Sequence, residues 1–343
     1  MRLPLDISVK TGKSAQQSEN AAERLASLAY DDMRRVDALI LERMGSPVPL
    51  IPKLAHYLVE AGGKRIRPLI TLASARMLGY DGDAQLKLAA AVEFIHTATL
   101  LHDDVVDESG LRRGKKAANV VWGNAPSVLV GDFLFARSFM LMVDAGSLEA
   151  LHSLSRAASI IAEGEVRQLA AAGDIDVTVE SYRAIIEAKT AALFAAAAEV
   201  SGIIADRPAS EIAALDTYGR ELGLAFQLVD DMLDYGGFDA DLGKNTGDDF
   251  RESKVTLPVA LALQKASDEE RDFWERVISQ KEQREDDFEQ ARAYIESHGA
   301  LEATLDAART HAEAARAALD VFPDNVWKQA LSDLAEFVVD RVY

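Results

Sequence analysis

The sequence predicts an all-α protein. Apolar residues make up 49% of the 343 residues, ample for a core, and along most of the chain they recur every three or four positions, as on a helix face. Alternation of β-branched and polar residues over four or more positions, which would indicate strands, is scarce. Since no repeat or linker divides the chain, we expect a flexible polar tail at residues 1–22 and a single helical domain at residues 23–343.

The composition argues against several classes of function. A net charge of −19 disfavours nucleic acid and anionic membrane surfaces, which are bound through clustered Lys and Arg. The absence of cysteine excludes disulfides, thiolate catalysis and zinc–thiolate sites. The longest uncharged apolar run, near residues 191–198, is far shorter than the roughly 18 residues of a membrane span, and residues 1–20 lack the apolar segment of a signal peptide. We therefore expect a cytoplasmic protein without a transmembrane segment or a nucleic-acid partner.

The first helices are predicted over about residues 30–44 and 49–60, where apolar residues follow a helical period. The segment GGKRIRP, residues 62–68, comes next, and Pro68 suits the first turn of the following helix. Its glycines permit close approach to an anion, and its cations precede a helix N-terminus, as in a phosphate site. A solvated basic turn is the simpler explanation, but the acidic clusters described next favour the phosphate site.

Residues 83–108 are predicted to form one long helix that is apolar nearly all round and therefore buried. Arg112 and Arg113 follow it after a Ser-Gly break. Carboxylates one helical turn apart share a face, and they repel one another unless a cation lies between them. The helix ends in three such carboxylates: Asp103, Asp104 and Asp107.

A second cluster of the same design lies in the helix predicted over residues 210–235, and a polar, glycine-containing loop follows it over residues 236–254. The loop could close over a charged ligand or be an exposed connector. Mg²⁺ is usually held by one or two carboxylates together with substrate phosphates. Two facing clusters therefore indicate several Mg²⁺ ions that hold a diphosphate, with nearby cations neutralising the remaining charge. The second cluster is Asp230, Asp231 and Asp234, and the nearby cations are Arg112, Arg113, Lys244 and Lys254.

Two further polar positions lie within apolar helices. His96 precedes Asp103 by seven residues, so both point from one face about 10 Å apart; a buried core histidine and a substrate contact are equal alternatives. Lys189 and Thr190 head an Ala-rich run in the helix predicted over residues 179–202, and they are either a surface pair or phosphate ligands. Other helices are predicted over residues 127–144 and 147–172, and four or so follow Leu257.

Taken together, the motifs resemble those of the trans-isoprenyl diphosphate synthases, most closely the long-chain octaprenyl and decaprenyl enzymes. GGKRIRP, HDDVVD with RRG behind it, Lys189-Thr190, FQLVDDMLD and the loop from Lys244 to Lys254 occur in the family's order, and the likeness covers about residues 50–265 closely. It implies one all-α domain around a deep cavity, with both Asp clusters at its mouth, usually as a homodimer.

The resemblance also implies residue roles. Three Mg²⁺ ions, present when substrate is bound, would be held by Asp103, Asp104, Asp107, Asp230, Asp231 and Asp234. The allylic diphosphate would contact Arg112, Lys189 and Lys254, with Thr190, Gln227 and Lys244 close by. Isopentenyl diphosphate would contact Lys64, Arg67, His96 and Arg113. The catalytic set would be Asp103, Asp104, Asp107, Arg112, Lys189, Asp230, Asp231 and Lys244.

Product length in such an enzyme depends on how far the growing tail can run along the helix below Asp103. Thr99 lies one turn below, with Ala98 beside it, where short-chain members commonly place Phe or Tyr. The small residues imply an open shaft and a product of about eight to ten units for quinone side chains, grown from farnesyl or geranylgeranyl diphosphate.

Three alternatives remain open at this point. The chain could be a shorter-chain synthase, such as a geranylgeranyl diphosphate synthase, with its floor on another helix. It could be a terpene cyclase, which the GGKRIRP turn and Arg113 disfavour because a cyclase needs no isopentenyl site. It could also be a non-catalytic partner subunit, although both Asp clusters are intact.

Overall fold

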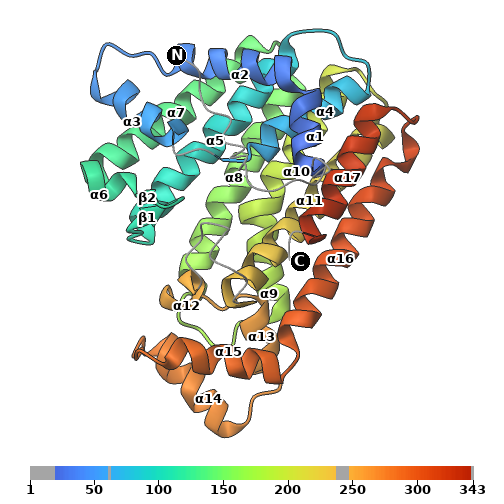
Figure 1. Cartoon of the computed structure of the whole chain (residues 1–343). Helices are drawn as coiled ribbons and strands as arrows, with labels where there is room; N and C mark the ends of the chain where they lie inside the picture. Colours follow the sequence, from blue (N-terminus) through green and yellow to red (C-terminus); the bar gives the residue numbers. More distant parts are fainter. Residues whose placement is uncertain (1–19, 61–62, 237–246, 341–343) are drawn as a thin grey trace, which may run out of the picture.

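The computed structural model describes residues 20–60, 63–236 and 247–340, and it confirms the all-α prediction (Figure 1). Lys244 and residues 1–19 lie outside the described residues. The first helices are α1 (Ala21–Leu28), α2 (Tyr30–Arg43), α3 (Leu50–Glu60), α4 (Ile66–Met77), α5 (Ala84–Val106), α6 (Ala118–Trp122), α7 (Asn124–Asp144) and α8 (Leu148–Ala171). They are followed by α9 (Val179–Ile186), α10 (Ala192–Ile204), α11 (Ala209–Gly236), α12 (Asp248–Arg251), α13 (Leu257–Leu263), α14 (Asp268–Trp274), α15 (Asp287–Ser297), α16 (Ala300–Ala318) and α17 (Val326–Asp340).

Short elements complete the chain. Strands β1 (Leu111–Arg112) and β2 (Lys115–Lys116) form an antiparallel hairpin. A π turn, η1 (Glu187–Ala191), joins α9 to α10, so the helix predicted over residues 179–202 is interrupted where Lys189 and Thr190 lie. A second π turn, η3 (Glu275–Ser279), and a 3₁₀ turn, η4 (Leu319–Val321), lie in the C-terminal part.

The main core is formed by long helices that pack around α5, α10 and α11. α5 is buried nearly all round, as predicted, and α10 is buried along almost its whole length. α10 and α11 approach closely because α11 has glycines at the contact. A Cβ at Gly219 would lie 2.3 Å from the carbonyl oxygen of Phe194, and one at Gly223 would lie 2.7 Å from Cα of Ala191.

A second, smaller core lies beneath the C-terminal end of α11, where α12 to α15 gather at the lower end of Figure 1. Fully buried aromatic residues, Tyr235 and Trp274, anchor it together with Phe250 of α12. This core supports the short helix and the segment that carry Lys254 toward α5.

The N-terminal boundary differs from the prediction. α1 begins at Ala21, inside the segment predicted as tail, and Asn20 and Glu23 form a reciprocal capping box at its start. This N-cap signal was present in the sequence, but the apolar pattern of an eight-residue helix is short enough to be overlooked.

One helix among the described residues, α7, is long and apolar enough to cross a membrane by length and composition alone. The sequence analysis had not singled it out. Of its apolar window 39% is buried, because α7 packs along α5.

Candidate active site

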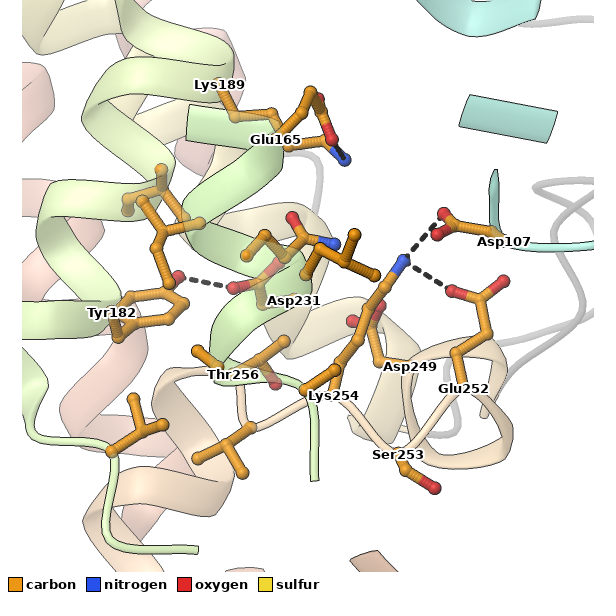
Figure 2. A pocket seen from close by; sticks show the side chains of 18 of the residues that line it. Asp107, Glu165, Tyr182, Lys189, Asp231, Asp249, Glu252, Ser253, Lys254 and Thr256 are labelled. Carbon is orange, nitrogen blue, oxygen red and sulfur yellow. Dashed lines mark hydrogen bonds and ion pairs between the residues drawn. The ribbon is translucent and has the colours of Figure 1, made fainter. Parts of the chain in front are cut away.

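The C-terminal ends of α5 and α11 meet at a cavity of about 590 Å³. Its wall also includes residues of α8, α9, η1 and α12 and of the segment 252–256 that follows α12. Asp107 of the first cluster and Asp231 of the second both line it, with Lys254 between them (Figure 2). The structure therefore brings together the two clusters, which are far apart in the sequence.

The three aspartates of the first cluster contact three different cations. Asp103 lies 3.8 Å from the ammonium of Lys189, and Asp107 accepts a hydrogen bond of 3.1 Å from Lys254. Asp104 is 1% exposed and accepts two hydrogen bonds from the guanidinium of Arg112, one of them 2.9 Å long from Nε. The predicted cations thus lie beside the predicted carboxylates, and Arg112 pairs with a buried one.

Glu165 of α8 is a member of this group that the sequence analysis missed. Its Oε2 accepts a 2.8 Å hydrogen bond from Lys189, and its Oε1 is buried without a hydrogen-bond partner in the described part of the chain. Burial raises the pKa of Asp103 to about 7, Lys189 opposes this, and Glu165 and Asp107 add to it. Asp103 therefore holds a proton more readily than an ordinary aspartate does.

The aspartates of the second cluster differ in burial and in hydrogen-bond partners. Asp231 is 2% exposed; its Oδ1 accepts a 2.7 Å hydrogen bond from Gln227 and its Oδ2 a short one from Tyr182. Burial raises the pKa of Asp231 to about 7, although these two hydrogen bonds act to lower it. Asp230 is half-buried.

Asp234 has a structural role that the sequence did not predict. Its carboxylate accepts backbone N–H groups from Gly247, Asp248 and Asp249 at 3.1, 3.1 and 3.0 Å, which satisfies the first amides of α12. This cap joins the end of α11 to the segment that carries Lys254. Asp249 itself is half-buried near Asp231 and Asp234, and desolvation together with these two carboxylates raises its pKa well above the ordinary value.

The donor set fits a hard divalent cation, but the aspartates are not gathered around one point. In the described ranges, no three acidic or histidine side chains lie close enough together to hold a metal ion unaided. Mg²⁺ needs only one or two carboxylates when substrate phosphates supply further oxygens. An added cation would lower the raised pKa of Asp103 and would give the buried Oε1 of Glu165 a partner.

The residues predicted to bind isopentenyl diphosphate lie partly together in the structure, near Arg112. Nη1 of Arg67 donates to Nε2 of His96 at 3.2 Å. Burial and three nearby arginines hold the pKa of His96 well below its ordinary value, so the ring is neutral and accepts this hydrogen bond. Burial also lowers the pKa of Arg67 to about 10, and its guanidinium stacks 4.4 Å from the ring centre of Phe194.

Arg113 reaches the same place from the tip of the hairpin. Arg113 and Gly114 form its two-residue turn, both with positive φ (52° and 73°), as a type I′ turn requires. The guanidinium lies against Gly63, where a Cβ would be 2.6 Å from Nη1. Any larger residue at Gly63 would displace Arg113.

The other two cations of GGKRIRP contact other helices. Arg65, with φ of 46°, pairs with Asp37 of α2 and lies 4.0 Å from Glu93 of α5, so it holds the turn in place. The ammonium of Lys64 lies 5.9 Å from the ring centre of Phe337 on α17.

The predicted chain-length residues lie below the cavity on α5. Ala98 is completely buried in the main core, whereas Thr99 is half-buried and donates to the carbonyl oxygen of His96 at 2.8 Å. Neither belongs to the lining of the described cavity.

Comparison with known proteins assigns the chain and its fold to a family. Residues 48–295 match the family model described as polyprenyl synthetase. The chain belongs to the polyprenyl synthetase family. It is 48% identical to the octaprenyl diphosphate synthase of Escherichia coli over 93% of this chain and 98% of that one.

Solved structures of family members give the same result. A polyprenyl synthase from Caulobacter crescentus, crystallised with calcium and isoprenyl diphosphate, is 56% identical, with a TM-score of 0.91 over 95% of this chain and 99% of that one. A decaprenyl diphosphate synthase from Rhodobacter capsulatus is 54% identical, with a TM-score of 0.90 over 94% and 99% of the two chains. The likeness spans both aspartate clusters and the C-terminal helices.

Proposed function

We propose that the chain condenses an allylic diphosphate with successive isopentenyl diphosphates to give an all-trans polyprenyl diphosphate of about eight to ten units. As a polyprenyl synthetase family member with long-chain relatives at 48% and 54% identity, it is a prenyltransferase of the long-chain type. The primer would be farnesyl or geranylgeranyl diphosphate, and the product would supply quinone side chains.

The observation that carries the proposal is the meeting of both aspartate clusters with the cations at one cavity. Asp107, Lys189, Asp231 and Lys254 line the same space. Lys189 and Lys254, which pair with carboxylates, are positioned to bind the allylic diphosphate as its negative charge develops. Family members bind diphosphate with a divalent metal, and Mg²⁺ held by the aspartates would add Lewis-acid stabilisation to the departing diphosphate.

Arg67, His96 and Arg113 would bind the second substrate. Two guanidinium groups beside a neutral imidazole provide donors for a diphosphate, and the carboxylate of Glu93 attracts both arginines in the free protein. The double bond of isopentenyl diphosphate attacks the allylic cation, and the departing diphosphate takes the proton, so no protein base is required.

We also propose a cytoplasmic homodimer. α7 exposes an apolar face that includes Leu129 and Val143, which are 66% and 64% exposed. An exposed apolar face of this kind marks an interaction surface, and a second copy would cover it in a dimer.

The test is to incubate purified protein with Mg²⁺, radiolabelled isopentenyl diphosphate and farnesyl diphosphate, and to measure label incorporated into extractable product. Incorporation that is lost on chelation of the metal supports the proposal. Release of diphosphate from farnesyl diphosphate without incorporation would indicate a cyclase, and no turnover would indicate a subunit that needs a partner.

A further inference from the structure

A buried tyrosine outside all the predicted motifs reaches the second cluster. Tyr182 lies on α9 and is 4% exposed, and its hydroxyl donates a short hydrogen bond to Oδ2 of Asp231 (Figure 2). The other oxygen, Oδ1, accepts from Gln227. Protein donors therefore hold both oxygens of Asp231.

Thr190 completes this network from the same stretch of helix. Its hydroxyl donates to Oε1 of Gln227 at 2.8 Å, so Tyr182 and Thr190 together hold two side chains that stand one turn apart on α11. The four residues form one continuous hydrogen-bonded chain from α9 through α11 to η1.

The π turn η1 brings the two hydroxyls onto one face. Tyr182 and Thr190 are eight residues apart, a separation that rotates side chains by about 80° on a regular α-helix. Thr190 lies within η1, whose wider turn reduces this rotation. The irregular turn therefore aims both groups at α11.

A buried tyrosine hydroxyl does not need a carboxylate as its hydrogen-bond partner. Tyr218 is equally enclosed, in the main core, and its hydroxyl donates to the backbone carbonyl of Leu331 at 2.9 Å. Tyr182 instead donates to a carboxylate that lines the cavity. An outer hydrogen bond of this kind fixes the orientation of a metal-binding carboxylate, and its removal typically lowers metal affinity by about 10–100-fold.

We propose that Tyr182 is a positioning residue that holds the Asp231 carboxylate in the orientation that binds a divalent metal–diphosphate complex. The inference rests on the proposed function, since it concerns the same site. It assigns to α9 a part in substrate binding that no sequence motif indicates.

The test compares Tyr182→Phe with the matched control Tyr218→Phe, because each removes one buried hydroxyl and leaves the ring. Binding of inorganic pyrophosphate in the presence of Mg²⁺ is measured by calorimetry on the whole chain, with thermal unfolding as the measure of stability. We expect Tyr182→Phe to weaken Mg²⁺-dependent pyrophosphate binding about tenfold or more, and Tyr218→Phe to leave it within about twofold, while both lower the unfolding midpoint.

Wild-type affinity in Tyr182→Phe, or an equal loss in Tyr218→Phe, would overturn the proposal, as would a wild-type chain that binds no pyrophosphate with Mg²⁺. If the wild type binds pyrophosphate but adds no isoprene units, the proposed function is wrong, and the comparison of the two variants still decides the role of Tyr182.

Discussion

The aspartates of the first cluster are neighbours in the sequence, yet their cationic partners come from three other elements: η1, β1 and the segment after α12. In the free protein the lysines neutralise Asp103 and Asp107. A bound diphosphate would attract the same lysines and leave these carboxylates to a metal ion. Asp104 differs, since its burial and its paired contacts with Arg112 make it the residue that holds Arg112 in place.

Asp103 predicts a pH dependence of stability in the metal-free protein. Burial raises its pKa from 3.8 to about 7, so between these values the folded chain keeps a proton that the unfolded chain has lost. The contribution of this group to stability is therefore complete below about pH 4 and is lost as the pH rises through about 7.

Asp103→Asn should remove that dependence, because an amide does not titrate. Thermal unfolding between pH 5 and pH 8 without metal should show a smaller decline in the midpoint for the variant than for the wild type, with the largest gain over the wild type at pH 8. Parallel curves for the two proteins would contradict the raised pKa.

Thr99 is the better of the two predicted positions for altering product length. Ala98 is fully buried, so Ala98→Phe would overpack the core and cost about 1–3 kcal/mol of stability. Thr99 is half-buried and can accept a larger side chain with less strain. We expect Thr99→Tyr to shorten the main product by at least one isoprene unit, as measured by mass spectrometry. The control Thr99→Ser should make a product of unchanged length. An unchanged length in Thr99→Tyr would mean that the tail runs elsewhere.

At the level of helices, the sequence predicted the positions of those helices that local apolar periodicity and capping residues determine. α3, α5, α8 and α11 lie within a few residues of their predicted positions, because each has a long apolar face and a Gly or polar end. The π turn η1 was not predicted, since its place depends on packing: Gly164 of α8 lets Ala188 and Lys189 approach it closely.

Side-chain partners were the harder part of the site. Arg65 lies within a basic motif, but its partners are on α2 and α5, so the sequence alone did not separate it from Arg67. Tyr182 and Glu165 are single polar residues in amphipathic helices, and their partners Asp231 and Lys189 are 49 and 24 residues away. Only the fold brings such pairs together.

The α10–α11 contact predicts a large effect of a small change. A methyl group at Gly219 would lie 2.3 Å from a backbone oxygen that cannot move independently. We expect Gly219→Ala to lower the free energy of unfolding by about 1–3 kcal/mol, measured by denaturant unfolding. The control is Gly110→Ala, where the added Cβ meets nothing within 4 Å; equal stability of the two variants would show that the helices separate at no cost.

At the scale of the whole molecule, α7 exposes an apolar face that has no evident role in a monomer. Its side chains repeat at helical spacing opposite the face that packs on α5, and they include Val128, Leu129, Phe139, Met140 and Val143. A dimer would bury this face near the helices that carry the first cluster and so stabilise α5 indirectly.

We expect Leu129→Glu combined with Val143→Glu to convert the proposed dimer to monomer, because charges would then be buried without partners. Sedimentation velocity measures the change, and Val326→Glu, at an exposed apolar position of α17, is the control. A dimer that persists in the double variant would exclude this face as the interface.

The central claim is that both aspartate clusters and their cations serve one cavity in which a long chain is assembled. It is tested most directly by the length of the product that the purified wild-type chain makes from farnesyl and isopentenyl diphosphates with Mg²⁺, determined by mass spectrometry of the extracted alcohols. The account predicts a main product of about eight to ten isoprene units. A main product of four units or fewer would contradict the long-chain assignment and place the floor of the cavity above Thr99.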